Sequence, residues 1–267
     1  MKTRGPIAGV IGAVVASTCL GGLLGGCTRY HVPGGPADFR AMGLSVMEQE
    51  HITDSSIAEE FEKRPAATFP ARIAVVRLQD RGYRNHRHES WGDGSATVVS
   101  VRDVEDTAHF DRLVEMDGIA GIAMLNRMII PESIHELDDL RTAAARVQAD
   151  MVYVYTFNTR FGVTKTVPFL GAITLGLFPN DQARVSSTAS AVLMDSRTGY
   201  IYGLAEGTSK TTQLANNWTS QDAIDQSRIR AEREAFDQMI EQTELMWRGM
   251  FDALRRQATP DPTDNEG

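Results

Sequence analysis

Four side chains that could ligate a metal ion lie within a stretch of eight residues. They are His86, His88, Glu89 and Asp93. Two imidazoles two residues apart, with carboxylates close by, can bind zinc or copper. Arg84 and Arg87 oppose a bound cation, and no metalloprotease or calcium-loop motif surrounds the histidines. We therefore interpret the stretch as a solvated polar loop, with a metal-dependent envelope enzyme that uses His86 and His88 as the alternative.

Other reactive motifs are missing from the sequence. There is no Gly-x-Ser-x-Gly elbow that would expose a nucleophilic serine, and Gly92-Asp93-Gly94 is too short for a phosphate-binding loop. The acidic pairs Glu105-Asp106 and Asp138-Asp139 are expected to be solvated, because adjacent residues on a helix point in different directions. The sequence therefore predicts a protein that is not an enzyme and has no cofactor.

Cys27 has the chemistry that is easiest to predict. It ends the run Leu24-Gly25-Gly26-Cys27, which follows an apolar stretch with Lys2 and Arg4 at its start. This order of basic, apolar and small residues is typical of an export signal, and the run resembles the lipobox of bacterial lipoproteins. The resemblance implies cleavage before Cys27, a diacylglycerol on its sulfur and a fatty acid such as palmitate on its amine. These chains would anchor the protein to one leaflet.

Two further features bear on the location. Thr28 follows Cys27, whereas an aspartate in that place retains lipoproteins of enteric bacteria in the inner membrane. The resemblance therefore implies the periplasmic face of the outer membrane. The stretch Pro6 to Leu24 is also about long enough to span a bilayer as an uncleaved helix, but its many glycines and alanines favour a cleaved leader.

Removal of residues 1–26 would leave an acidic chain without thiols. The sequence has 27 Lys and Arg and 35 Asp and Glu, and loss of Lys2 and Arg4 would change the formal charge from −8 to −10. Such a chain lacks the basic surface that binds nucleic acid. Cys19 would leave with the leader and Cys27 would be acylated, which excludes cysteine nucleophiles, thiolate metal sites and disulfides.

The predicted organisation is a signal peptide, a tether, one domain and a tail. Residues 1–26 form the leader, and residues 27–50 form a lipidated N-terminus and tether that contains Pro33-Gly34-Gly35-Pro36. Residues 51–257 form a single periplasmic α/β domain. Residues 258–267 are acidic and proline-bearing and predict a disordered tail.

Hydrophobic periodicity predicts the elements of this domain. Strands are expected at Arg72 to Leu78, Ala96 to Val101 and Met151 to Phe157, with a hairpin of Val185 to Met194 and Tyr200 to Thr208 that turns at Gly199. Helices are expected at Asp54 to Lys63, Asp103 to Met116, Ser133 to Gln148 and Ser220 to Gln257. Ser133 and Glu136 match a capping box. The fold class is α+β, an α/β sandwich in which helices pack a mixed sheet and a long amphipathic helix ends the domain.

An apolar segment between two predicted strands is the most unusual feature of the domain. Val167 to Pro179 is nearly uncharged, where a solvated loop would be polar. Three interpretations stay open: a buried excursion into the core, an interface with a partner or a second copy, and contact with lipid near the anchor. The candidate partner-binding residues are Phe169, Leu170, Ile173, Leu175, Leu177 and Phe178.

Two resemblances accompany these patterns. Ile73 to Leu78, Leu140 to Tyr155 and Asp195 to Tyr202 resemble small periplasmic α/β domains such as those of the curli-secretion lipoprotein and the penicillin-binding-protein activator lipoprotein. Four longer stretches are similar to the uncharacterised rhombotarget lipoproteins, namely Phe69 to Gln79, Asp103 to Pro131, Leu140 to Phe161 and Val185 to Ser220. That resemblance implies a location and no activity. The C-terminal protease signal of some members is not found in this sequence.

We expect from the sequence a lipid-anchored periplasmic protein that binds another envelope protein or associates with itself. An anchor, a tether and a domain without a reactive motif favour this role. The alternatives are the metal-dependent enzyme described above and a subunit of a secretion assembly. A spanning β-hairpin would need about 9 to 11 residues per strand, which Val167 to Pro179 does not supply.

Overall fold

The computed structural model describes residues 34–38, 42, 54–85, 91–92, 94–100, 102–165, 181–214 and 221–258. The chain divides into two compact units, Met1–Tyr30 and His31–Gly267, and every described residue belongs to the second. Its helices are α1 (Asp54–Glu62), α2 (Thr107–Val114), α3 (Leu137–Arg146) and α5 (Gln221–Ala258). Its strands are β1 (Ala71–Asp80), β2 (Ala96–Val98), β3 (Ile119–Met124), β4 (Met151–Lys165), β5 (Asp181–Asp195) and β6 (Ile201–Leu214).

The strands form one mixed sheet. The order is β2-β1-β4-β5-β6, and β3 pairs with β1. β1 runs parallel to β3 and β4 and antiparallel to β2, whereas β4, β5 and β6 form two antiparallel pairs. This mixed sheet with packed helices and a long terminal helix confirms the predicted α+β class.

β4 and β6 extend well beyond their predicted ends at Phe157 and Thr208, and β5 begins before its predicted start at Val185. β4 and β5 pair from Met151 and Asp195 to Lys165 and Asp181. The second half of β4 is mostly polar and lacks the apolar, β-branched run that identified its first half. The turn after β5 is as predicted, because Gly199 has a φ of 71°, which glycine adopts without strain.

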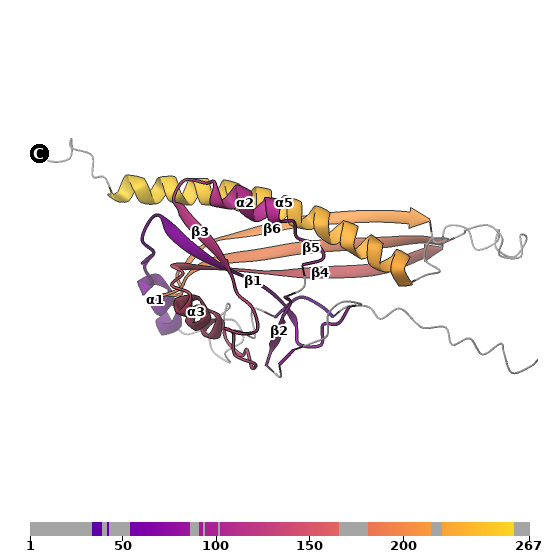
Figure 1. Cartoon of the computed structure of the whole chain (residues 1–267), viewed down its shortest axis with the longest axis horizontal. Coiled ribbons are helices and arrows are strands. Elements are labelled where there is room, and N and C mark those ends of the chain that lie inside the picture. The colour runs from indigo at the N-terminus through magenta and orange to yellow at the C-terminus, as the bar shows by residue number, and fades with distance from the viewer. Residues whose placement is uncertain are drawn as a thin grey trace, which may run out of the picture. The chain divides into compact units, whose positions relative to one another are not determined.

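The helices cover the two faces of the sheet unequally. On one face α5 runs along the sheet (Figure 1), and its Phe236 and Met239 pack with Ala189, Ala191 and Leu193 of β5. On the other face α3 packs Leu140 and Ala144 against a core that includes Val192 and Met194 of β5. Successive residues of β5 thus enter opposite cores, as the pleat of a strand requires.

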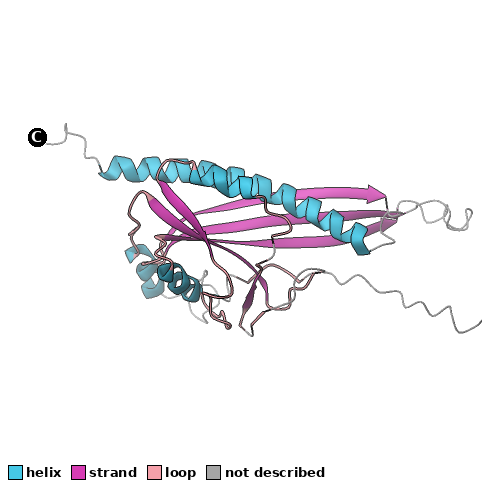
Figure 2. Cartoon of the chain, in the orientation of Figure 1, coloured by secondary structure: helices cyan, strands magenta, loops and turns pink. Residues whose placement is uncertain are grey.

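None of the described helices covers the face opposite α5 over the outer half of the long strands (Figure 2). There the outward residues, apart from Leu204, are polar, and all are partly or fully exposed, in contrast to the buried residues between them. We call this surface the open face, and it comprises Asn158, Arg160, Arg184, Ser186, Thr188, Ser190, Leu204, Glu206, Thr208 and Lys210. Thr188 and Thr208 share a hydrogen bond across it, with their hydroxyl oxygens 3.0 Å apart.

Small residues on β6 allow α5 to lie close to the sheet. Every second residue of β6 faces α5, and these residues are Gly203, Ala205, Gly207 and Ser209. A Cβ atom at Gly207 would collide with the backbone of Ala235 and Met239, and one at Gly203 would collide with Met246. α5 thereby covers the edge strand. Gln238 Oε1 also accepts a hydrogen bond of 3.2 Å from the backbone N–H of Thr208.

Two local predictions need correction. α2 begins at Thr107 because Asp106 caps it, so Asp103 and Glu105 lie in the segment before the helix. α3 begins at Leu137 with Glu136 as N-cap, and its capping box joins Glu136 to Asp139 rather than to Ser133.

Among the described residues, no helix combines the length and hydrophobicity that crossing a bilayer requires.

Candidate functional site

The residues that the sequence singled out for chemistry lie outside the described part of the chain. This holds for Cys27, for the metal candidates His86, His88, Glu89 and Asp93, and for the apolar segment Val167 to Pro179. Within the described ranges, no group of three or more His, Cys, Asp and Glu side chains is placed to hold a metal ion.

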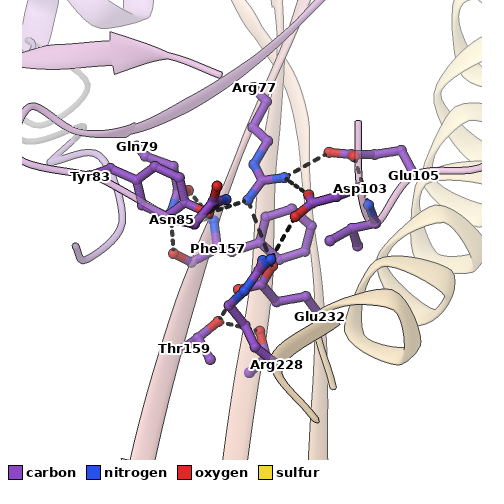
Figure 3. Close-up of polar contacts among 12 residues, drawn as sticks. Arg77, Gln79, Tyr83, Asn85, Asp103, Glu105, Phe157, Thr159, Arg228 and Glu232 are labelled. Carbon is purple, nitrogen blue, oxygen red and sulfur yellow. Dashed lines mark hydrogen bonds and ion pairs between the residues drawn. The ribbon is translucent and has the colours of Figure 1, made fainter. Parts of the chain in front are cut away.

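The densest group of charges in the described residues is buried between the sheet and α5. Figure 3 shows two arginines and three carboxylates that meet there from distant parts of the chain. We call this group the charge cluster, and it consists of Arg77 from β1, Asp103 and Glu105 from the segment before α2, and Arg228 and Glu232 from α5. The side chains of these five residues are at most 1% exposed, so solvent does not screen their charges.

Arg228 is bonded to three carboxylates at once. Its Nη2 donates to Asp103 Oδ2 at 2.6 Å, and its Nη1 donates to Glu232 Oε2 at 2.5 Å. Its Nε donates to Asp225 Oδ1 at 2.9 Å. A planar guanidinium has donors in three directions, whereas a lysine ammonium is a point charge. The position is therefore specific for arginine.

Arg77 occupies the other half of the charge cluster. Its Nη1 lies 3.4 Å from Asp103 Oδ1 and 3.3 Å from Glu105 Oε1, and its Nη2 lies 3.7 Å from Glu232 Oε2. The guanidinium also lies 4.5 Å from the ring centroid of Phe157, within the range of a cation–π contact. Asp103 thus bridges the two arginines.

Neighbouring hydroxyl groups complete the bonding of the carboxylates. The Tyr155 hydroxyl donates to Glu105 Oε1 at 2.8 Å, and the Thr159 hydroxyl donates to Glu232 Oε1 at 2.8 Å. Arg77 Nη2 donates to the Tyr83 hydroxyl at 3.1 Å. Arg77 Nε is the one nitrogen of the charge cluster that is buried without a hydrogen-bond partner.

The charges shift the pKa values in opposite directions. Burial raises the pKa of Asp103, but Arg228 and Arg77 outweigh burial and hold this pKa below its usual range. Burial raises the pKa of Glu232 above its usual range in spite of the same two arginines. Burial disfavours the charged form of Arg228, but Glu232 and Asp103 raise its pKa above the ordinary value. Glu232 is therefore a more ready proton acceptor than Asp103.

The charge cluster joins several secondary-structure elements, and most of its polar atoms are already bonded within the protein rather than available to a ligand. Both arginines are held in the charged form, and their carboxylate partners accept bonds from within the protein. A buried ion pair strongly penalises the loss of either partner. The charge cluster therefore fixes the first half of α5 against β1 and the segment before α2.

A second polar group lies beside α2. His109 Nε2 is 2.5 Å from Asp237 Oδ1, and His109 Nδ1 accepts from the backbone N–H of Asp106 at 3.2 Å. A hollow of about 650 Å³ adjoins this pair, with Arg102 and Arg233 in its wall. Both ring nitrogens are engaged, so His109 joins α2 to α5 as part of the helix cap.

The sequence analysis overlooked the charge cluster, and its prediction for Glu105 was wrong. Glu105 is bonded to Arg77 and Tyr155, and Asp106 caps α2, so neither is a simply solvated acid. One signal was present in the sequence: Asp225, Arg228 and Glu232 follow one another at helical spacing. Residues 103 and 77 could not be added, because their contacts with α5 depend on the tertiary fold.

Comparisons with protein families and with curated proteins give no match to this chain. The fold and the described contacts are therefore the basis for the proposals that follow.

Proposed function

We propose that this protein is a lipid-anchored module of the bacterial envelope that binds another envelope protein or a second copy of itself, without catalysis. The sequence supports the anchor through Leu24-Gly25-Gly26-Cys27 and the small and basic residues before it. The outer membrane, on its periplasmic side, is the proposed location.

The open face is the observation that favours a binding role most. The outer half of β4, β5 and β6 has α5 on one side and an exposed polar surface on the other. The arginines and carboxylates of the charge cluster pair with one another and hold α5 against the sheet, so the sheet has a fixed shape. A rigid sheet with an exposed face provides many side chains whose positions are fixed before a partner binds, which lowers the entropic cost of binding.

Crosslinking in intact cells tests this role. A photoreactive residue replaces Thr188 on the open face in one variant and Leu170 in the apolar segment in another. A third variant carries it at the exposed Glu241 of α5 as the matched control. We expect crosslinks to a specific envelope protein, or to the protein itself, from Thr188 or Leu170 and not from Glu241. Crosslinks only within the domain from both test positions would contradict a binding role.

Elemental analysis of the purified protein separates this role from metal-dependent catalysis. The binding role requires no bound metal, and we expect none at stoichiometric amounts. Zinc or copper at one ion per chain, lost in His88→Ala, would favour an enzyme that uses His86 and His88 instead.

A further inference from the structure

Helix α1 has an apolar stripe that the rest of its own chain leaves exposed. Ile57 is 44% exposed and Phe61 is 76% exposed. Residues four apart lie on the same side of a helix, so these two side chains form one surface. Such spacing normally packs a helix onto a core, but among the described residues Ile57 stays partly exposed and Phe61 largely exposed.

Acidic residues surround this stripe. α1 contains Asp54, Glu59, Glu60 and Glu62 and no basic residue. At 100° per residue, Asp54 and Glu60 lie on either side of the line through Ile57 and Phe61. Lys63, directly after the helix, pairs with Glu60 at 2.6 Å. The surface of α1 thus combines an apolar stripe with excess negative charge.

The open face has the complementary properties. Arg160, Arg184 and Lys210 are exposed on three adjacent strands. Arg160 and Lys210 lie opposite Ser186 in the same row across the sheet, and Arg184 lies in the next row outward. Leu204 lies six residues before Lys210 on the same side of β6 and is 65% exposed. Three cations and an exposed leucine therefore share this surface with one acid, Glu206, which accepts a hydrogen bond from Ser190.

We propose that α1 of one copy docks on the open face of a second copy, with Phe61 against Leu204 and the helix acids toward Arg160 and Lys210. This inference rests on the proposed binding role and deepens it by naming the partner. A helix of nine residues is about 14 Å long, and the six-residue step from Leu204 to Lys210 spans about 20 Å. With Phe61 against Leu204, the long side chains of Arg160 and Lys210 would therefore extend toward Asp54 at the start of the helix. Each copy has both surfaces, so the contact runs head to tail and builds rings or filaments rather than isolated dimers.

The mass of the full chain in solution tests this proposal. The protein is extracted in a mild detergent as its host makes it, and its mass is measured by sedimentation equilibrium over a range of concentrations. We expect assemblies larger than a dimer that dissociate as salt is raised, because exposed ion pairs are screened. A monomer at all concentrations and low salt overturns the proposal.

Two variants remove one surface each. Phe61→Asp alters the helix stripe, and Arg160→Glu with Lys210→Glu alters the open face. Each is expected to weaken self-association by about tenfold or more, as loss of a central contact does. Leu245→Asp is the control, because Leu245 is 59% exposed on α5 and belongs to neither surface. All substituted side chains are exposed, and circular dichroism checks that each variant is folded.

Mixing these two variants distinguishes a head-to-tail contact from a symmetric one. The Phe61→Asp chain keeps an intact open face, and the Arg160→Glu, Lys210→Glu chain keeps an intact α1. In a mixture, α1 of the second chain can dock on the open face of the first, but the reverse contact cannot form. Assembly should therefore stop at a one-to-one dimer. No complex in the mixture overturns the proposal. Combining Asp54→Lys and Glu60→Lys with Arg160→Glu and Lys210→Glu in one chain should restore assembly. If the protein assembles and none of these substitutions changes the assembly, the proposed contact between α1 and the open face is wrong. A crosslink to a different envelope protein would still support the proposed binding role.

Discussion

Arg228 on α5 and Asp103 in the segment before α2 lie 125 residues apart in the chain, and their Nη2 and Oδ2 atoms are 2.6 Å apart. Both side chains are completely buried. The pair joins the terminal helix to the part of the chain that follows β2. Asp103 also forms an ion pair with Arg77 of β1. Fold stability is therefore expected to depend on this pair more than on any surface charge.

Substitution Arg228→Met should destabilise the fold by about 3–5 kcal/mol, because it leaves Asp225 without its cation and leaves Asp103 and Glu232 with Arg77 alone in a buried site. Arg228→Lys should recover only part of this loss, since one ammonium cannot bond to three carboxylates in fixed directions. Urea unfolding measures both. Arg248→Met is the control: its 3.7 Å pair with Glu244 is on the surface, and its loss should cost less than about 1 kcal/mol. Equal effects at the two arginines would contradict the structural role of the charge cluster.

Asp195 gives a pH-dependent prediction. Burial raises its pKa, but hydrogen bonds from Tyr202 and from the backbone N–H groups of Ala66, Thr198 and Arg197 outweigh burial and hold the pKa below its usual range. A lowered pKa in the folded state contributes stability above the unfolded value, 3.8, and this stability is lost as the pH falls through the folded value.

The variant Asp195→Asn should therefore be less stable than the parent at pH 7, by about 2–4 kcal/mol. The difference should shrink steadily below about pH 4. Urea unfolding across this pH range measures it, with Asp138→Asn as control because Asp138 is 71% exposed. A difference that is constant from pH 7 to pH 2.5 would show that the charge of Asp195 does not contribute.

Two glycines, one in β6 and one in β4, should respond differently to the same change. Gly207→Ala places a Cβ against the backbone of α5 and should destabilise by about 1–3 kcal/mol or more, because the helix must move away. Gly162→Ala has nothing within 4 Å of the new atom and should be neutral or slightly stabilising. Thermal unfolding compares the two. If Gly207→Ala is as well tolerated as Gly162→Ala, the close approach of α5 to β6 is not important for stability.

Growth with a clickable palmitate analogue tests the proposed anchor. The parent protein should incorporate the label and sediment with membranes, and Cys27→Ser should lose both properties because the acylated sulfur is gone. Cys19→Ser is the matched control, since Cys19 precedes the expected cleavage site. Label retained in Cys27→Ser would show that another residue is acylated.

Local patterns in the sequence predicted most of the helices and strands. They could not predict the contacts between residues that lie far apart in the chain. The hairpin at Gly199 and the helix that contains Phe236 follow from spacing and turn chemistry, because both depend on residues that are near in the chain. The second halves of β4 and β6 were shortened in the prediction. Their serines, threonines and glycines have low hydrophobicity, and only pairing and the approach of α5 make them strands.

The prediction for α1 shows a different limit. Its position was predicted correctly, but periodicity does not reveal what a helix packs against, so the exposure of Phe61 became known only from the fold. The charge cluster depends in the same way on tertiary structure. Arg77 is in an apolar strand and Asp103 is in a loop, and neither has a partner within its own element.

The position of α5 over β6 has a consequence for the edge of the sheet. The border of a sheet normally has free amide and carbonyl groups that can capture strands of other molecules and start a fibril. Here α5 lies close above the border, and Gln238 accepts the outward N–H of Thr208. Removal of this side chain, for example in Gln238→Ala, would leave the N–H of Thr208 free to pair with a strand of another molecule.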